Sequence, residues 1–282
     1  MRMFKYFGAE RLSVIENCLI RFSPPAAFND PFEFFPFIKS INTQDEFEST
    51  LVEYADRDHS DLYAAMDEGV KAIMSKEEFH VRMSANMRLM APLIRHNMES
   101  SIPAMQEALY AGWNNHIGVL CLSEKNDDLL MWAHYADCHK GFVLEFDPQS
   151  DFFNRKVGPN DSLRSLRKVV YGQKRPEVTL SQTNEEEFFL TKSDHWEYEA
   201  EWRMMLPLSE ADKTLDMAGE KICLFEFPVN AVKSVVLGAK MPEGLSMAVI
   251  EKLRSNNAYK NVSLFRAKIH PTDYRLIVEQ ID

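Results

Sequence analysis

The sequence predicts an α+β fold, with a mixed or antiparallel sheet built from strands on both sides of a helical segment. Two observations predict the sheet: residues 117–123 and 142–146 are short apolar runs bounded by polar residues, as buried strands are. A third predicts the helices, because residues 43–116 are poor in glycine and carry apolar side chains at helical spacing. Elements segregated along the chain in this way are typical of the α+β class.

The same patterns predict the other elements. The predicted strands are residues 4–7, 18–22, 117–123, 142–146, 168–171, 199–206, 231–237, 262–269 and 274–278. The predicted helices outside 43–116 are residues 10–17, a short turn within 126–141, 185–191 and 242–255. Because no internal repeat, low-complexity tract or flexible linker interrupts the chain, we expect one domain over residues 1–282, with 43–116 as an insertion of three or four helices.

Composition excludes several classes of protein. The chain has 282 residues, 45% of them hydrophobic, which is ordinary for a globular protein. Its formal net charge of −11 argues against duplex nucleic acid as a partner, because such binding neutralises phosphates with basic side chains. No apolar run approaches the roughly 20 residues that span a membrane, and the N-terminus has the pattern of a strand, not of a signal peptide. The four cysteines fit no disulfide framework, which favours a reducing cytoplasm.

Residues 131–141 combine aromatic, imidazole and charged side chains between the two apolar strands. Asn126 opens a good helix start, because short polar side chains accept bonds from free backbone amides. Gly141 is a good helix end, because glycine takes the left-handed conformation cheaply. We therefore expect one short helix that presents binding groups at the rim of a cleft. Its candidate binding residues are Trp132, His134, Tyr135 and Lys140.

This stretch also contains potential metal ligands, but their spacing is poor. His134 and His139 are five residues apart, whereas two ligands on one helix face are usually four apart. Cys138 and His139 are adjacent, so their side chains point apart and make a poor nucleophile and base. We therefore expect no metal site. Lys140 is a candidate to hold a phosphate as a point charge, although an exposed lysine needs no such role.

A second acidic stretch lies at residues 196–203. If the backbone is extended from Glu199 onward, Glu199, Glu201 and Arg203 project from one strand face. One carboxylate can then stabilise an oxocarbenium-like centre, as in glycosidic cleavage, and the other can accept a proton from a nucleophile. The simpler interpretation is a surface face with an internal Glu–Arg pair that contributes little.

Two further candidates lie near the N-terminus. Lys5 and Tyr6, on the first strand, can bind a nucleotide by charge and stacking, or can simply belong to a half-exposed strand. Ser23 ends the second strand, and Asn29 and Asp30 open a turn that reaches Glu33. Asn and Asp often bond their own backbone in turns, so this turn has either a structural role or a side chain that reaches a ligand.

Taken in order, these motifs resemble an uncharacterised bacterial family, domain of unknown function 2971. The motifs that carry the resemblance are Lys5-Tyr6, Phe22-Ser23-Pro24, residues 28–33, Cys121-Leu122-Ser123, residues 131–137, His139-Lys140-Gly141 and the Trp196-x-x-Glu-x-Glu-x-Arg203 pattern. The resemblance runs from Phe4 to about Val278. The family label by itself implies no activity.

The layout is also similar, more weakly, to the ADP-ribosyltransferase superfamily, whose members hold NAD in a cleft between two small sheets. That resemblance implies Lys5 or Tyr6 as the first motif, Ser23 as the second and Glu201 as the catalytic glutamate, with Glu199 assisting. Lys5 stands where arginine or histidine is usual, and a long insertion follows the second motif. The implied activity is cleavage of the nicotinamide N-glycosidic bond of NAD, with His134 and Tyr135 lining the cleft.

The residues implied for this site fall into two groups. The catalytic residues are Glu201, Glu199 and His134. The cofactor-binding residues are Lys5, Tyr6, Ser23, Asn29, Asp30, Trp132, Tyr135, Lys140 and Arg203. The acceptor of the ADP-ribosyl group stays open among protein, nucleic acid and water.

Two alternatives remain open. The first is a non-catalytic sensor or interaction module of a bacterial defence or toxin system, with the insertion as the surface for oligomerisation or partners. Its motivation is Met83, Met87 and Met90 at helical spacing, because methionine surfaces adapt to varied partners; an ordinary helical core also explains them. The second is a metal-dependent nuclease or hydrolase. Its candidate residues are Asp30, Glu33, His134 and Glu201.

Overall fold

A computed structural model describes residues 1–183, 185–217 and 219–281. The chain divides into two compact units. The sheet unit comprises Met1–Phe35, Tyr110–Arg175 and Phe188–Asp282. The helical unit comprises Pro36–Leu109 and Pro176–Glu187, so it includes a segment that lies far along the chain from residues 43–116.

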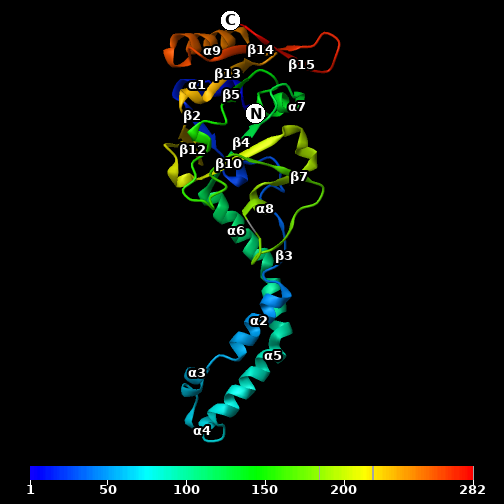
Figure 1. The fold of residues 1–282 in the computed structure, drawn as a ribbon, viewed down its shortest axis with the longest axis vertical. Helices are drawn as coiled ribbons and strands as arrows, with labels where there is room; N and C mark the ends of the chain where they lie inside the picture. The colour runs from blue at the N-terminus through cyan, green and yellow to red at the C-terminus, as the bar shows by residue number, and fades with distance from the viewer. Residues whose placement is uncertain (184, 218, 282) are drawn as a thin grey trace. The chain divides into compact units, whose positions relative to one another are not determined.

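A mixed sheet forms the frame of the sheet unit and confirms the α+β class (Figure 1). Across the part of the chain that the structure describes, it has eight strands in the order β15-β14-β13-β5-β1-β4-β10-β6. These strands are β1 (Met3–Phe7), β4 (Ile117–Ser123), β5 (Phe142–Phe146), β6 (Arg167–Lys168), β10 (Glu201–Pro207), β13 (Val232–Leu237), β14 (Ser263–Ile269) and β15 (Leu276–Gln280). Only β13 and β14 pair in parallel; every other neighbouring pair in this sheet is antiparallel.

Three smaller sheets accompany it. The strands β11 (Lys213–Met217), β12 (Glu220–Glu226) and β2 (Leu19–Phe22) form an antiparallel sheet. The strands β7 (Val170–Gly172) and β9 (Thr191–Ser193) pair in parallel, as do β3 (Phe37–Ser40) and β8 (Glu177–Thr179) in the helical unit. The strands β3, β8, β9, β11 and β12 were not predicted from the sequence.

Residues 43–116 are helical as predicted, but the structure describes five helices there, whereas three or four were predicted. They are α2 (Gln44–Ala55), α3 (Ser60–Ala64), α4 (Glu68–Lys71), α5 (Lys76–Ser100) and α6 (Ile102–His116). Thr43 begins α2 with a capping box, in which its hydroxyl accepts from the Glu46 amide and the Glu46 carboxylate accepts from the Thr43 amide. Ser75 caps α5 in the same position, with its side chain accepting from the Glu78 amide.

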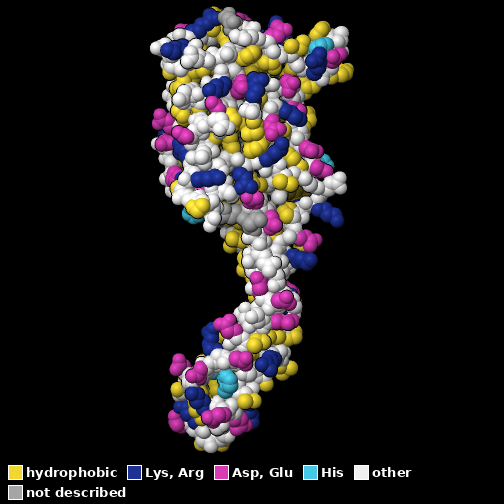
Figure 2. Space-filling model, in the orientation of Figure 1, with side chains coloured by type: hydrophobic (Ala, Val, Ile, Leu, Met, Phe, Trp, Pro, Cys, Tyr) yellow, Lys and Arg dark blue, Asp and Glu magenta, His cyan; other side chains and the backbone are white. Residues whose placement is uncertain are grey.

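The other helices are short except for α9. They are α1 (Ser13–Asn17), α7 (Leu129–Tyr135), α8 (Glu185–Phe189) and α9 (Glu243–Ser255). Single 3-10 turns lie at Ala9–Arg11, Pro25–Ala27, Asp151–Phe153, Asp194–Glu199, Leu208–Glu210, Val229–Ala231 and Asn257–Tyr259. On the sheet unit, Figure 2 shows acidic and basic side chains interspersed on the visible face.

The strand β1 sends side chains into both layers of the core. Met3 and Phe7 pack into the larger apolar cluster, whereas Phe4 and Tyr6 pack with Trp132 of α7. This alternation follows from the period of two along a strand. It anchors α7 on the same sheet face as Phe4 and Tyr6.

The main sheet opens between β1 and β4. These strands share a single register pair, Phe4 with Ser123, whereas β4 pairs with β10 along all seven of its residues. Further along β4, the partner of Val119 is Ser23, through an isolated bridge. We call the interval between these two contacts the β1–β4 gap. It places a break in the backbone ladder at Cys121, in the middle of β4.

The chain leaves α7 through a different turn from the one predicted. The left-handed residues are Asp137, Cys138 and His139, with φ of 45°, 51° and 70°, and Gly141 is not among them. A Cβ on Gly141 would lie 2.0 Å from the Phe7 carbonyl oxygen. Gly141 is therefore required by close approach to β1, not by a left-handed cap.

We expect Gly141→Ala to lower the free energy of unfolding by at least about 2 kcal/mol, because the clashing atom belongs to the backbone and cannot rotate away. Gly158→Ala is the matched control, since a Cβ there meets nothing within 4 Å. Urea unfolding of both variants measures the difference. A near-neutral Gly141→Ala variant would contradict the steric account.

Candidate functional site

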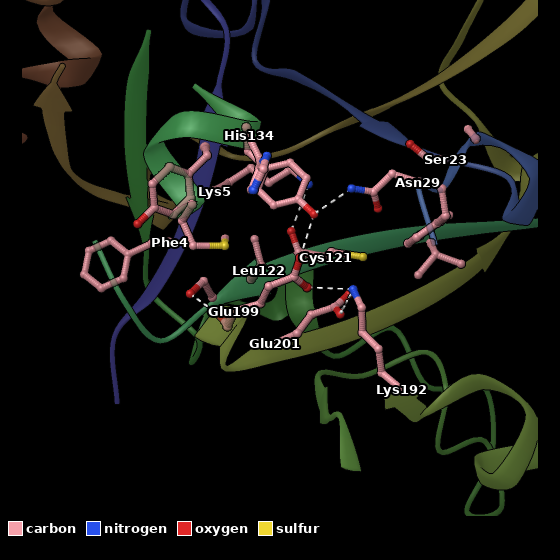
Figure 3. A pocket seen from close by; sticks show the side chains of 17 residues that line it. Phe4, Lys5, Ser23, Asn29, Cys121, Leu122, His134, Lys192, Glu199 and Glu201 are labelled. Carbon is pink, nitrogen blue, oxygen red and sulfur yellow. Dashed lines mark hydrogen bonds and ion pairs between the residues drawn. The ribbon is translucent and has the colours of Figure 1, made fainter. Parts of the chain in front are cut away.

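A cavity of about 390 Å³ lies in the sheet unit at the β1–β4 gap (Figure 3). This volume lies within the range of small-ligand pockets, which hold a few convergent polar groups in a largely apolar wall. Eight of the predicted site residues line it. They are Lys5, Tyr6, Ser23, Asn29, His134, Tyr135, Glu199 and Glu201. Segments from both halves of the sequence therefore meet at one concavity.

Four predicted binding residues do not line the cavity. Asp30 caps its own turn, where its carboxylate accepts from the Phe32 amide at 2.9 Å. Trp132 is fully buried against Tyr6, and its indole N–H donates to the Asn126 carbonyl. Lys140 is exposed and lies 3.9 Å from the Asp137 carboxylate. Arg203 is fully buried and makes contacts that are described below.

Lys192 lies at the centre of the site, although it was not among the residues predicted from the sequence. Its ammonium lies 2.6 Å from the Glu199 carboxylate, 2.9 Å from Glu33 and 3.1 Å from Glu201. The side chain is 3% exposed and also lies over the Trp196 ring. A lysine on β9 thus holds carboxylates from three segments, and Figure 3 shows the side chains of Glu199 and Glu201 beside it. No spacing rule marks an isolated lysine for such a role.

Arg203 bonds two of the carboxylates that Lys192 contacts, Glu33 and Glu201. Its Nε donates to Glu201 at 2.9 Å, its Nη2 to Glu33 at 2.7 Å, and its Nη1 to the Phe189 carbonyl at 2.8 Å. The guanidinium also lies 5.0 Å from the centre of the Phe34 ring. Because the guanidinium bonds to Glu33, Glu201 and the Phe189 carbonyl and the side chain is wholly buried, Arg203 supports the site and does not face a ligand.

The prediction that Glu199 starts the strand is wrong. Glu199 ends a 3-10 turn, Ala200 takes a left-handed conformation with φ of 45°, and β10 begins at Glu201. The turn at Ala200 nevertheless brings both glutamates to Lys192. Glu201 and Arg203 do share a strand face, as predicted, and they bond to each other.

The two glutamates have opposite pKa shifts. Burial raises the pKa of Glu199, and the attraction of Lys192 offsets only part of that rise. Burial also acts to raise the pKa of Glu201, but Arg203 and Lys192 outweigh it and hold that pKa well below its usual range. Paired carboxyl groups whose pKa values are pushed apart are typical of sites that use one as a fixed charge and the other in proton transfer.

The lowered pKa of Glu201 makes stability depend on pH. The pKa of a glutamate in an unfolded chain is about 4.3. Above that pH the ionised Glu201 contributes its full stabilisation, and this contribution is lost as the pH falls toward the lower pKa of Glu201 in the folded protein. Glu199 contributes with the opposite sign, because its raised pKa makes ionisation costly to the fold as the pH rises.

We therefore expect Glu201→Gln to lose less stability than the wild type between about pH 5 and pH 3. Urea unfolding at each pH measures the loss in both proteins. The same loss in wild type and variant would show that Glu201 is not held ionised by its neighbours.

Tyr135 connects Glu199 to the mouth of the cavity. Its hydroxyl donates to Glu199 at 2.6 Å and accepts from the Asn29 side-chain amide at 3.3 Å. Burial, followed by the nearby negative charge of Glu199, raises the pKa of Tyr135, so the hydroxyl stays protonated. His134 is exposed beside it, with its ring 6.5 Å from that of Tyr198.

The N-terminal wall is made by β1 and the end of β2. Lys5 donates to the Cys121 carbonyl at 2.9 Å, within the β1–β4 gap. Tyr6 donates its hydroxyl to the Lys125 carbonyl and meets the Trp132 ring edge-on. Ser23 contributes through its backbone pairing with Val119. The Tyr6 hydroxyl therefore donates its hydrogen bond within the protein. The Lys5 ammonium donates one N–H to the Cys121 carbonyl, which leaves its other two N–H groups for a ligand.

Cys121 is a further wall residue that the sequence did not indicate as functional. Burial raises the pKa of its thiol, and the charge of Glu201 adds to the rise. The thiol therefore stays protonated and can donate to Glu201. Within the described ranges 1–183, 185–217 and 219–281, no group of three or more His, Cys, Asp or Glu side chains is arranged to hold a metal ion.

One segment of the chain is similar to a known protein family. Residues 131–204 match a family model described as protein of unknown function (DUF2971). The similarity to DUF2971 is therefore shown for residues 131–204 alone. The match confirms the predicted resemblance to DUF2971 for the motifs within residues 131–204 and does not extend to the motifs before residue 131. The matched segment contributes Tyr135, Lys192, Glu199 and Glu201 to the cavity wall. Lys5, Ser23 and Asn29 also line the cavity but lie outside the matched segment.

No curated protein matches the chain, and no solved structure does. Among the described residues, no helix has both the length and the apolar character needed to cross a membrane.

Proposed function

We propose that the chain is an enzyme of the ADP-ribosyltransferase type, which binds NAD in the cavity and cleaves its nicotinamide N-glycosidic bond. The observation that carries the proposal is the convergence of Lys5, His134, Glu199 and Glu201 on one cavity. Such a convergence of polar groups in a partly apolar hollow is the usual character of a ligand site. The opening of the main sheet at the β1–β4 gap also supports a cleft between two sheet halves, as an analogy at the level of the fold.

Glu201 is suited to stabilise positive charge on the nicotinamide ribose. It is 3% exposed, and Arg203 and Lys192 keep it ionised. A carboxylate fixed in advance stabilises an oxocarbenium-like transition state more than the neutral substrate, and this difference accelerates the reaction. The bond that breaks is the C–N bond to nicotinamide, and its electron pair leaves with the nicotinamide ring.

Glu199 is suited to accept the proton of the incoming nucleophile. It has fewer charged donors than Glu201: Lys192 bonds one oxygen and the neutral Tyr135 hydroxyl bonds the other. Its raised pKa brings it nearer to neutral pH, where a general base is most effective. Tyr135 and His134 then orient the cofactor or the acceptor at the mouth of the cavity.

The test is release of nicotinamide from NAD, measured with and without cell lysate. We expect release by the wild type and a loss of about 10²- to 10³-fold in Glu201→Gln, the usual effect of removing one group that stabilises transition-state charge. Dependence on lysate would indicate a macromolecular acceptor, whereas release without lysate would indicate water.

Glu210→Gln is the matched control, because Glu210 is half-exposed, pairs with Arg164 and lies outside the cavity. This variant should release nicotinamide at the wild-type rate. Equal release by wild type and Glu201→Gln, or no release under either condition, would refute the proposed cleavage.

A second candidate, a partner-binding sensor module, is favoured by the surface of α5 in the helical unit. Val81, Leu89 and Leu93 are 66%, 77% and 49% exposed and recur every four or eight residues along that helix. Large apolar side chains in such a row often mark an interaction surface. Light scattering at increasing protein concentration tests this candidate, which requires a stable oligomer or a partner that purifies with the chain.

A further inference from the structure

The backbone at Cys121 faces the β1–β4 gap. The N–H and carbonyl of Val119 both form hydrogen bonds with the backbone of Ser23. They therefore point away from β10. Peptide groups alternate in direction along an antiparallel strand, and β4 pairs with β10 without a bulge. Two residues on, Cys121 therefore directs its N–H and carbonyl to the same edge as Val119.

No register pair fills that edge at Cys121. The contact of β1 with β4 stops at Phe4 and Ser123, and a continued ladder would have placed Tyr6 opposite Cys121. The Lys5 ammonium takes the Cys121 carbonyl instead, at 2.9 Å. The Cys121 N–H is aimed into the gap beside it, and both residues line the cavity.

Lys5 differs from the other two cations of the site. Arg203 and Lys192 are both neutralised by buried carboxylates. Lys5 is half-buried, and its ammonium donates to the neutral Cys121 carbonyl. Across the described ranges it forms no ion pair with a carboxylate. A partly desolvated ammonium without a counter-charge is costly, and an anionic ligand would relieve that cost.

We propose that the Lys5 ammonium and the Cys121 N–H form an anion subsite that binds a phosphate oxygen of a nucleotide. This rests on the proposed function for the other end of the ligand, where the sugar meets Glu199 and Glu201. The subsite defines the substrate class as a phosphorylated nucleotide, and not an unphosphorylated riboside. Figure 3 shows Lys5 and Cys121 in the same cavity as the two glutamates.

The charges of the cavity fit such a ligand. Glu33, Glu199 and Glu201 against Lys192 and Arg203 leave one excess negative charge at the carboxylate end, where a sugar cation would develop. Lys5 supplies positive charge at the gap. A charged N–H donor to an anionic oxygen forms one of the stronger hydrogen bonds in proteins, so the subsite contributes to affinity as well as to orientation.

The test is isothermal titration calorimetry of the whole chain with ADP-ribose and with adenosine. We expect the wild type to bind ADP-ribose at least about tenfold more tightly than adenosine, and Lys5→Met to bind ADP-ribose about 10- to 100-fold more weakly than the wild type. Lys5→Arg keeps the charge and should keep most of the affinity. Lys140→Met is the control, since Lys140 lies outside the cavity, and it should bind as the wild type does.

A comparison of AMP with adenosine on the wild type needs no variant, and these two ligands differ only in the phosphate. AMP should bind more tightly than adenosine, so the comparison decides the question even if Lys5→Met fails to fold. Equal affinities for the two ligands, no binding of ADP-ribose, or wild-type affinity in a folded Lys5→Met would overturn the subsite. Nicotinamide release is measured separately. A chain that releases none, yet loses ADP-ribose affinity in Lys5→Met, would uphold the subsite and refute only the cleavage.

Discussion

Replacing Arg203 with methionine is expected to lower the free energy of unfolding by about 3–5 kcal/mol, the usual cost of breaking a buried ion pair by removing one partner. Arg203 is fully buried and bonds both Glu33 and Glu201. Without it, Lys192 remains as the single cation among three buried carboxylates. The loss arises from uncompensated charge, not from lost volume, because methionine fills much of the same space.

Two controls separate this effect from a general loss of charge. Lys268→Met removes an exposed pair with Glu279 and should cost less than about 1 kcal/mol. Adding Glu33→Gln to Arg203→Met should recover part of the stability, because it removes one of the stranded charges. Urea unfolding at neutral pH measures all three variants. An Arg203→Met variant no less stable than Lys268→Met would contradict the buried network.

Replacing Lys192 with methionine is expected to reduce nicotinamide release at neutral pH by about 100-fold or more. Lys192 opposes the rise in the pKa of Glu199 and holds its carboxylate near Glu201. Without Lys192 the two glutamates repel each other, and the pKa of Glu199 rises further. A general base must be ionised, so the acidic limb of the rate profile should move to higher pH.

A pH–rate profile of Lys192→Met and Lys192→Arg checks this prediction. The arginine variant keeps the charge, so its profile should stay closer to that of the wild type. Carbon NMR titration of the Glu199 carboxyl group gives a second reading that does not depend on turnover. An unchanged Glu199 titration in Lys192→Met would show that the lysine does not control this carboxylate.

The sequence predicted the frame of the fold well where strands are buried. Residues 117–123 and 142–146 became β4 and β5, because continuous apolar runs of that length leave few alternatives. The hairpin of β11 and β12 was not predicted, since Lys213–Met217 is largely exposed and mixes charged and apolar residues without a clear period. Its pairing with β2 depends on contacts between distant segments.

The site was predictable in part. Glu201, His134 and Tyr135 belong to dense motifs of functional side chains, and these were found. Lys192 lies just before the Trp196–Arg203 motif and outside its spacing, and its role arises only when the fold brings it to Glu33 and Glu201. Conversely, Trp132 and Arg203 lie in the same motifs but are fully buried, and they contact the wall residues Tyr6 and Glu201 instead of lining the cavity. Sequence proximity to functional groups therefore does not separate ligand contacts from their supports.

The most direct test of the central claim is a crystal structure of Glu201→Gln grown with NAD, because the variant should bind the substrate and turn it over slowly. We predict NAD in the cavity at the β1–β4 gap, with a hydroxyl of the nicotinamide ribose about 3 Å from the side chain at position 199 or 201. NAD bound elsewhere on the chain, or a cavity without NAD at saturating concentration, would contradict the account.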